Sequence, residues 1–425
     1  MDQFNYKQGK LFAEQVPVET IAEKVGTPVF IYSKATFLEH LRKIQYAYSD
    51  LQTMVCFSVK ACSNINILKF MAKAGSGFDI VSGGELYRAL LAGADPAKIV
   101  YAGVGKTDGE IIESLEAGIG YFNIESEAEL ENLIRLSKQR GKIPKAALRV
   151  NPDVDPKTHT YTTTGVKETK FGVDIEHAEK VFDQFGKNLN IRLCALHIHL
   201  GSAGHTVQPY VEALRKTLTL VDKLRSRGFT IEAIDTGGGY GADYITAQSP
   251  TAEDYADAIV PMLKGRELKL ILEPGASIAA NAGVLLTRVL YYKTGGTKKF
   301  VIVDAGMNDL IRPPLYNAFH FIWPAEIDEK LVPQRRDKEL KITGTEVVDV
   351  VGPICESADF FAKDRAIPPA KRGDLLSIFT AGAYGFTMAS NYNARCRAAE
   401  VLVDGDKFSI IRKRESYEDL VALEK

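Results

Sequence analysis

The chain is poor in cysteine, with five among its 425 residues. These are Cys56, Cys62, Cys194, Cys355 and Cys396, an odd number with no C-x-x-C pair among them. That pattern argues against a disulfide framework and against a structural zinc site. We therefore expect the protein to work in a reducing, cytoplasmic environment.

The sequence also lacks long apolar runs and a strong charge of either sign. No run of about 20 apolar residues, the length that crosses a bilayer, is present. The opening stretch MDQFNYKQGKLF is polar and lacks the charged-then-apolar layout of a signal peptide. A formal net charge of −1 provides neither a basic field for nucleic acid nor a polybasic membrane patch. We expect no membrane and no nucleic-acid partner.

What the chain does contain is a recurring pattern of short apolar stretches, most of them separated by helix-like segments. Its length exceeds the usual single domain of about 100–200 residues, which favours two domains. The stretches lie at 54–60, 77–82, 98–103, 120–125, 145–150, 193–200, 232–237 and 269–273. Alternating strands and helices predict parallel strands with crossovers, and eight units suffice to close a TIM-like (β/α)8 barrel of the α/β class.

The pattern changes after about residue 285. Strand-like stretches without long intervening helices then follow, at 284–293, 298–306, 340–352, 374–379 and 400–414. They predict a second, all-β domain. The stretch VFIYS at 29–33 precedes the first barrel strand and is expected to pair with that domain. The expected domains are a barrel at 35–284 and a β-domain formed by 1–34 with 285–425.

Three motifs at the ends of predicted barrel strands carry the groups that a pyridoxal phosphate site needs. Lys60 ends MVCFSVK, Gly237-Gly238-Gly239 follow AIDT, and Glu273 ends LILE before Pro-Gly. A lysine forms an imine, a glycine run offers backbone N–H groups to phosphate, and a carboxylate holds a proton on the pyridine nitrogen. Catalytic groups of such barrels lie at these strand ends. Because a protonated ring is a strong electron sink, the motifs predict a carbanion-forming enzyme.

Each motif also has a structural interpretation. Lys60 could extend its ammonium to solvent, although lysine is rarely buried without a partner. The glycine run could be a flexible turn, and Glu273 could form a structural ion pair. His197 and His199, in LHIHLGS, share a face if this stretch is a strand. They could bind a metal, but the ends of strands one to five offer no histidine as a further ligand, so we expect no metal.

Taken together, the motifs resemble the diaminopimelate decarboxylase family of fold-type III pyridoxal phosphate enzymes. Alanine racemase and the eukaryotic-type ornithine decarboxylases are relatives of that family. The resemblance runs from about residue 28 to 415. In the barrel it is carried by FSVKACSN, FDIVSGGEL, KFG, HIHLGS, DTGGGYG and EPG. In the C-terminal part it is carried by VDAGMNDLIRPPLY, VGPICESAD, GAYGFTMASNYN and NARCR.

The resemblance implies roles for individual residues around the cofactor. Lys60 would hold pyridoxal 5'-phosphate covalently, His199 would contact its ring, and Glu273 would bind the pyridine nitrogen. Ser202 and the three glycines would hold the phosphate. The full cofactor-binding set implied is Lys60, His199, Ser202, Gly237, Gly238, Gly239, Glu273, Gly275 and Tyr384.

The resemblance also implies the substrate and its contacts. The implied reaction is decarboxylation of meso-2,6-diaminopimelate to L-lysine and carbon dioxide, in lysine biosynthesis. Cys355, flanked by Gly-Pro and Glu356, would protonate the carbanion, although a free cysteine is often an inert buried thiol. In the family this loop enters the neighbouring subunit's site, which implies a homodimer with shared active sites. The substrate-binding residues implied are Arg312, Tyr316, Glu356 and Tyr384.

One position departs from the family. Where the family has arginine after Glu-Pro-Gly, this chain has Ala276. In relatives that arginine contacts the distal carboxylate end of the substrate or the phosphate, so its loss removes a bidentate anion clamp. A related decarboxylase for D-lysine, D-ornithine or another basic amino acid is the alternative. A racemase, which normally has arginine at the pyridine nitrogen, is disfavoured by Glu273. An idle cofactor-binding protein would be expected to lose Lys60 or Cys355.

Overall fold

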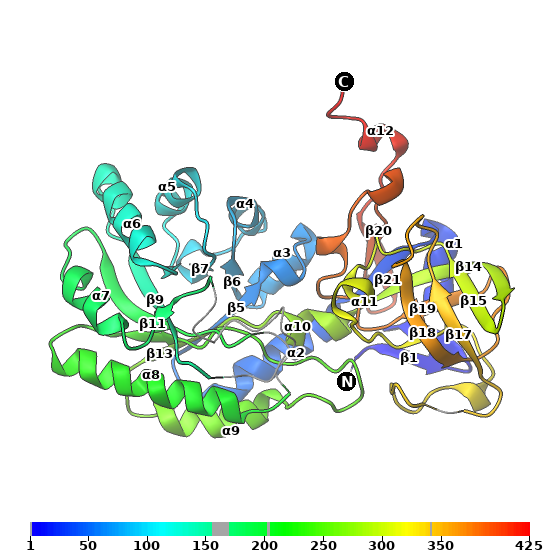
Figure 1. Cartoon of the computed structure of the whole chain (residues 1–425), viewed down its shortest axis with the longest axis horizontal. Helices are drawn as coiled ribbons and strands as arrows, with labels where there is room; N and C mark the ends of the chain where they lie inside the picture. The colour runs from blue at the N-terminus through cyan, green and yellow to red at the C-terminus, as the bar shows by residue number, and fades with distance from the viewer. Residues whose placement is uncertain (1, 155–169, 202–204, 341) are drawn as a thin grey trace. The chain divides into compact units, whose positions relative to one another are not determined.

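The structure, a computed structural model, describes residues 2–154, 170–201, 205–340 and 342–425. The chain divides into two compact units (Figure 1). The first, called the β unit here, is formed by Met1–Glu39, Ala242–Gln248 and Ser277–Lys425. The second, called the barrel unit, is formed by His40–Gly241 and Ser249–Ala276.

Eight parallel strands close a barrel in the barrel unit. They are β5 (Thr53–Ser58), β6 (Gly77–Ile80), β7 (Ile99–Tyr101), β8 (Tyr121–Ile124), β9 (Lys145–Asn151), β11 (Arg192–His197), β12 (Ala233–Asp235) and β13 (Lys269–Leu272). Each strand pairs with the next in this order, and β13 pairs with β5 to complete the ring. A short extra strand, β10 (Val173–Asp174), pairs with β9. The strands coincide with the eight apolar stretches, and the predicted (β/α)8 barrel is confirmed.

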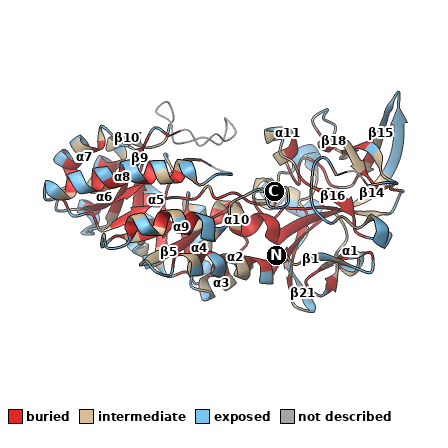
Figure 2. Cartoon of the chain, turned by 90° about the horizontal axis from the view of Figure 1, so that it is seen from below, coloured by how far each residue is buried: buried red, intermediate tan, exposed pale blue. Residues whose placement is uncertain are grey.

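Helices cover the outside of this barrel (Figure 1). They are α3 (Ile65–Lys73), α4 (Gly83–Leu91), α5 (Asp108–Ala117), α6 (Glu127–Arg140), α7 (Ala178–Phe185), α8 (Gln208–Ser226) and α9 (Ala252–Leu263). Figure 2 shows that these helices have one buried side and one exposed side, and that the exposed residues lie on the outer side. In α6, for example, Leu130, Leu133 and Leu136 are buried. Their three-residue spacing produces the apolar stripe that packs a helix onto a sheet.

The β unit is built on a mixed sheet. Its strands are β4 (Val29–Ser33), β14 (Gly283–Gly295), β15 (Lys298–Val303), β16 (Ile322–Pro324), β17 (Glu346–Val351), β18 (Phe360–Ile367), β19 (Leu375–Ile378), β20 (Ala399–Asp404) and β21 (Lys407–Arg412). Most neighbours are antiparallel, but β20 is parallel to β4 and β15 to β17. The stretch 29–33 pairs with β14 and β20, so its expected place in this sheet is confirmed.

Smaller elements complete the β unit. Near the N-terminus, β1 (Phe4–Lys7), β2 (Lys10–Ala13) and β3 (Val16–Pro17) form a three-stranded sheet, followed by α1 (Val18–Val25). The short helices α11 (Arg312–Tyr316) and α12 (Tyr417–Leu420) lie further along the chain. No helix among the described residues has both the length and the apolar character needed to cross a membrane.

Two glycines of the barrel unit provide a test of its packing. A Cβ on Gly77, in β6, would lie 2.3 Å from the Lys98 carbonyl oxygen and 2.9 Å from Cys56 Sγ. A Cβ on Gly109, at the exposed start of α5, would meet nothing within 4 Å. We expect Gly77→Ala to lower the free energy of unfolding by about 1–3 kcal/mol through overpacking. Gly109→Ala should leave it unchanged or raise it by up to about 1 kcal/mol, because alanine favours helix.

Urea unfolding followed by circular dichroism measures both effects against the unmodified protein. If the two variants were equally stable, the packing described around Gly77 would be wrong.

Candidate active site

Lys60 lies directly after β5, in a single turn of 3-10 helix, η1 (Val59–Ala61). Its ammonium is 2.5 Å from Oδ2 of Asp79, a fully buried residue of β6. Ser58 Oγ lies 2.7 Å from the same carboxylate oxygen. Burial, followed by the charge of Glu273, raises the pKa of Asp79, while Lys60 and Ser58 oppose that shift. The lysine predicted from sequence is therefore held at the C-terminal end of the barrel strands by a buried carboxyl group.

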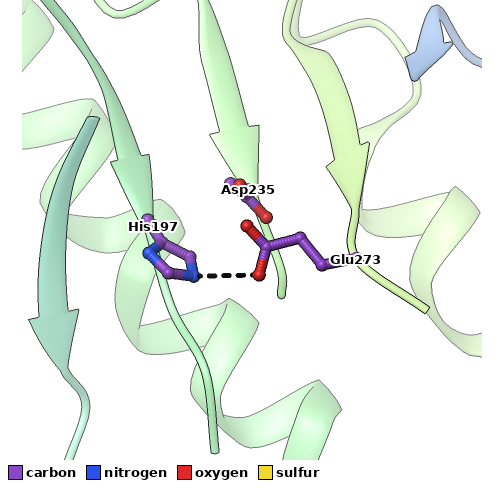
Figure 3. Close-up of side chains that lie close together, drawn as sticks. All are labelled: His197, Asp235 and Glu273. Atoms are coloured by element: carbon purple, nitrogen blue, oxygen red, sulfur yellow. Dashed lines mark ion pairs between the residues drawn. The ribbon is translucent and has the colours of Figure 1, made fainter. Parts of the chain in front are cut away.

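Glu273, which follows β13, is buried in a cluster of polar side chains inside the barrel. Figure 3 shows His197 and Asp235 beside it, at the ends of neighbouring strands β11 and β12. His197 Nε2 lies 3.6 Å from Glu273 Oε2. Asn123, from β8, donates from Nδ2 to Glu273 Oε1 at 2.9 Å and to Asp235 Oδ2 at 3.1 Å. One amide group therefore bridges the two carboxyl groups.

The two carboxyl groups of this cluster favour opposite protonation states. Burial, and then the charge of Glu273, raises the pKa of Asp235 well above its ordinary value. Burial alone would also raise the pKa of Glu273. His197, Lys60 and a hydrogen bond with Asp235 overcome that effect and hold this pKa below its ordinary value. Glu273 is thus the member of the pair that favours the charged form.

The same cluster has the spacing of a metal site, because donor atoms of His197, Asp235 and Glu273 all lie within 4.8 Å of one another. However, the Asn123 amide directs N–H groups at both carboxyl groups, where a cation would need their lone pairs. A carboxyl group with a raised pKa, like that of Asp235, is also a poorer metal ligand. The donor set fits a hydrogen-bonded network better than a metal centre, and the expected absence of a metal stays a prediction.

The glycine run follows β12 and is tightly packed. Gly237 and Gly239 have φ values of +68° and +88°, which favour glycine. A Cβ on Gly238 would lie 2.2 Å from the Glu273 carbonyl oxygen, and one on Gly239 would lie 1.9 Å from that of Gly201. The Gly237 N–H donates to Asp235 Oδ1 at 2.8 Å. These contacts require glycine and set the shape of the loop; phosphate binding by it stays a prediction.

His199 lies beside this loop, two residues beyond the end of β11. Its Nδ1 accepts the Gly238 N–H at 3.2 Å. Burial, and then the charge of Arg149, lowers the pKa of this imidazole well below its ordinary value, so the ring is neutral. A neutral ring that accepts at Nδ1 carries its proton on Nε2. The predicted contact at Ser202 lies outside the described residues.

A second buried ion pair lies at the ends of β8 and β9. Arg149 Nη1 is 2.8 Å from Glu125 Oε1, and the two side chains are 5% and 2% exposed. The guanidinium also stacks over Phe171, 4.6 Å from the ring centroid. Its Nε and Nη2 have no hydrogen-bond partner among the described residues. Because unsatisfied buried donors are costly, a polar ligand that accepts from them would be bound favourably.

Sequence reasoning missed four of these polar residues. They are Asp79, Asn123, Arg149 and Asp235. Each stands within an apolar stretch, in FDIV, YFNI, AALRVN and AIDT, close to the end of a predicted strand. A charged or amide side chain in that position is the signal that could have identified them, since such groups are seldom buried without partners.

The predicted substrate residues belong to the β unit, where three of them cluster. The Arg312 guanidinium lies 5.7 Å from the Tyr316 ring centroid and 5.9 Å from that of Tyr384. Tyr244, which sequence reasoning missed, lies 5.3 Å away. The Arg312 Nε is buried and has no hydrogen-bond partner in the described part of the chain. The three rings surround a cation that retains a donor for an anionic group.

Cys355 and Glu356 lie in an exposed loop between β17 and β18. Buried Asp359 shapes this loop by accepting the N–H groups of Ile354 at 2.6 Å and Met307 at 2.7 Å. The Cys355 N–H donates to Asn393 Oδ1 at 2.8 Å. Among the described residues, neither Cys355 nor Glu356 hydrogen-bonds to Arg312. The β unit thus presents the predicted proton donor on an accessible surface.

Comparison with known proteins agrees with this geometry. The family described as "Pyridoxal-dependent decarboxylase, pyridoxal binding domain" matches residues 34–280. The diaminopimelate decarboxylase of Haemophilus influenzae is 45% identical over 425 residues, covering 100% of this chain and 99% of the relative. The enzyme of that name from Pseudomonas aeruginosa is 47% identical over 422 residues, covering 99% and 98%.

Solved structures show the same relationship. Diaminopimelate decarboxylase from M. jannaschii in complex with L-lysine superposes with a TM-score of 0.92 at 37% identity, covering 100% of this chain and 98% of that one. The Helicobacter pylori enzyme, also with L-lysine, has a TM-score of 0.89 at 38% identity, covering 96% and 99%. This chain belongs to the diaminopimelate decarboxylase family of pyridoxal-dependent decarboxylases.

Proposed function

We propose that this protein is a pyridoxal phosphate-dependent carboxy-lyase that converts meso-2,6-diaminopimelate to L-lysine and carbon dioxide. The observation that carries the proposal is the placement of Lys60 and anionic Glu273 at the ends of adjacent strands β5 and β13. Full-length similarity to proteins named diaminopimelate decarboxylase supports the substrate. So does the L-lysine in two related structures. The reaction would serve lysine biosynthesis, in the cytoplasm.

Pyridoxal 5'-phosphate fits the residues of the barrel unit. The loop at Gly238 lies beside the neutral ring of His199, and Arg149 retains two N–H donors that no described residue accepts. We infer that Lys60 holds the cofactor covalently and that Glu273 meets the pyridine nitrogen. The remaining cofactor contacts proposed are His199, Ser202, Gly237, Gly238, Gly239, Gly275 and Tyr384. When bound, the cofactor supplies an electron sink for the pair of electrons left by carbon dioxide.

The side chains of the protein determine where protons are held and to which group they are transferred. Glu273 favours the anionic form in a buried site, so it would stabilise a proton on the pyridine nitrogen of a bound cofactor. His199 is neutral and offers an uncharged ring face beside the glycine loop. Lys60 must lose a proton before its amine can act as a nucleophile. Asp79, at 2.5 Å and with a raised pKa, is placed to accept that proton.

The β unit would supply the substrate contacts. We propose that Arg312 and Glu356, with Tyr316 and Tyr384, bind the amino acid and that Cys355 protonates its α-carbon. The exposed position of Cys355 supports a loop that reaches into the site of a second copy. The proposed assembly is a homodimer with shared active sites.

The first test is Lys60→Ala. The unmodified protein should take up pyridoxal phosphate, and borohydride reduction should attach it permanently to Lys60. Lys60→Ala should show no reducible attachment and no measurable decarboxylation, because the nucleophilic amine is lost. Lys264→Ala is the control, since this lysine forms an exposed ion pair with Asp50. A reduced cofactor recovered on Lys60→Ala would place the attachment elsewhere.

Mixing two inactive variants tests the shared site. Cys355→Ala should lose about 10²–10⁴-fold in kcat, the usual cost of removing a general acid. If each site combines Lys60 of one subunit with Cys355 of the other, random exchange between Lys60→Ala and Cys355→Ala dimers restores one site in half of the dimers. Activity should then rise to about a quarter of the unmodified value. No recovery after verified subunit exchange would place both residues in one subunit's site.

Ala276→Arg tests recognition of the distal carboxylate. An arginine–carboxylate pair in a partly desolvated pocket contributes about 10–100-fold in kcat/KM. If Ala276 weakens the protein toward meso-diaminopimelate, Ala276→Arg should raise kcat/KM by this factor, and the uncharged control Ala276→Met should not. Decarboxylation of D-lysine and D-ornithine, assayed in parallel, should be slower than that of meso-diaminopimelate. If either basic amino acid were decarboxylated faster than meso-diaminopimelate, that amino acid would replace meso-diaminopimelate as the proposed substrate.

A further inference from the structure

Asp235 is a buried carboxyl group that no catalytic role has yet used. It is the last residue of β12 and has no exposed surface. Its polar partners are the Gly237 N–H at 2.8 Å, Asn123 Nδ2 at 3.1 Å and the carboxyl group of Glu273. Among the residues that the structure describes, no lysine or arginine forms an ion pair with it. A carboxylate in such a position would be an uncompensated buried charge.

The charges around Asp235 make a second anion unfavourable. Glu273 favours the ionised form, and the Lys60 ammonium, which contributes to that preference, is paired with Asp79. His197 approaches Glu273 rather than Asp235 with its Nε2, as Figure 3 shows. An oxygen of Asp235 lies within 4.8 Å of one of Glu273, and two carboxylates at this distance repel each other strongly in a medium of low dielectric constant. A single proton held by the pair removes that repulsion and allows one carboxyl group to donate a hydrogen bond to the other.

We propose, on the basis of the function given above, that Asp235 is a positioning residue that keeps its proton, donates it in a hydrogen bond to Glu273, and so holds Glu273 ionised and correctly oriented. The other oxygen of Asp235 accepts the Gly237 N–H. One side chain would therefore fix both the anion that faces the pyridine nitrogen and the first glycine of the loop assigned to the phosphate. Asn123 completes the arrangement by donating to both carboxyl groups.

The variants Asp235→Asn and Asp235→Ala test whether Asp235 acts as a neutral hydrogen-bond donor or as a charged carboxylate. The asparagine amide is neutral like a protonated carboxyl group. It can donate to Glu273 and accept from Gly237, losing only the contact with Asn123. Alanine removes both hydrogen bonds. We expect the dissociation constant of pyridoxal phosphate to rise less than about 3-fold in Asp235→Asn but about 10-fold or more in Asp235→Ala. The exposed residue Asp222 provides the control Asp222→Asn, which should change nothing.

Infrared difference spectroscopy detects directly whether the carboxyl group of Asp235 is protonated. Full-length protein at neutral pH, with and without cofactor, should show the carbonyl stretch of a protonated carboxylic acid that shifts in D2O. This band should be absent from Asp235→Asn and retained in Asp222→Asn. Circular dichroism checks that each variant folds; if Asp235→Ala does not, the asparagine variant and the infrared band still decide the proposal.

Two results would overturn the proposal. One is an infrared spectrum in which Asp235→Asn loses no protonated-acid band. The other is cofactor binding in Asp235→Asn that is weakened as much as in Asp235→Ala, since this would show that the charge of Asp235 matters. The band in cofactor-free protein does not depend on the proposed enzyme activity. Failure of the unmodified protein to bind pyridoxal phosphate would therefore reject the proposed function without deciding the protonation state of Asp235.

Discussion

The pairing of β13 with β5 is the contact on which the candidate active site depends. Leu270, Ile271 and Leu272 align with Thr53, Met54 and Val55, and this pairing closes the eight-stranded ring. Because both strands run in the same direction, the residues that follow them emerge at the same end. The N–H of Ser58, the last residue of β5, donates to the Pro274 carbonyl at 3.0 Å and extends the contact past the end of β13. Barrel closure thus brings Glu273 and Lys60, 213 residues apart in the sequence, into one site.

The interior of the barrel is apolar in one part and polar at the carboxyl ends of the strands. The apolar surroundings strengthen the electrostatic interactions between the buried polar groups. An apolar cluster including Cys56, Val100, Ala147 and Ile271 packs part of the interior. At the carboxyl ends of the strands, buried charges replace these side chains. Each charge is matched there by a partner, as in the ion pairs of Lys60 with Asp79 and Arg149 with Glu125. In a medium of low dielectric constant an unmatched charge is costly, and the two N–H groups of Arg149 that no described residue accepts are the donors left for a bound ligand. The protonation states of neighbouring groups are therefore interdependent.

The two units contribute different kinds of chemistry. The barrel unit holds rigid, buried groups on strand ends, which suits the fixed position of a cofactor. The β unit presents Arg312 among tyrosine rings and Cys355 on an exposed loop shaped by Asp359. Loops vary in sequence more readily than strands do, so substrate contacts of this kind can change without disturbing the scaffold.

The sequence by itself determined the strand–helix alternation, and with it the barrel, because periodicity and glycine or proline breaks are local properties. It also determined the strand-end positions of Lys60, Glu273 and the glycine run. Only the tertiary structure decided which polar side chains meet. Asp79 reaches Lys60, and Asn123 and Asp235 reach Glu273, because barrel closure and strand register bring distant strand ends together. The protonation of Asp235 depends on burial and on neighbours contributed by two other strands, Asn123 of β8 and Glu273 after β13, and no local pattern in the sequence encodes such an environment.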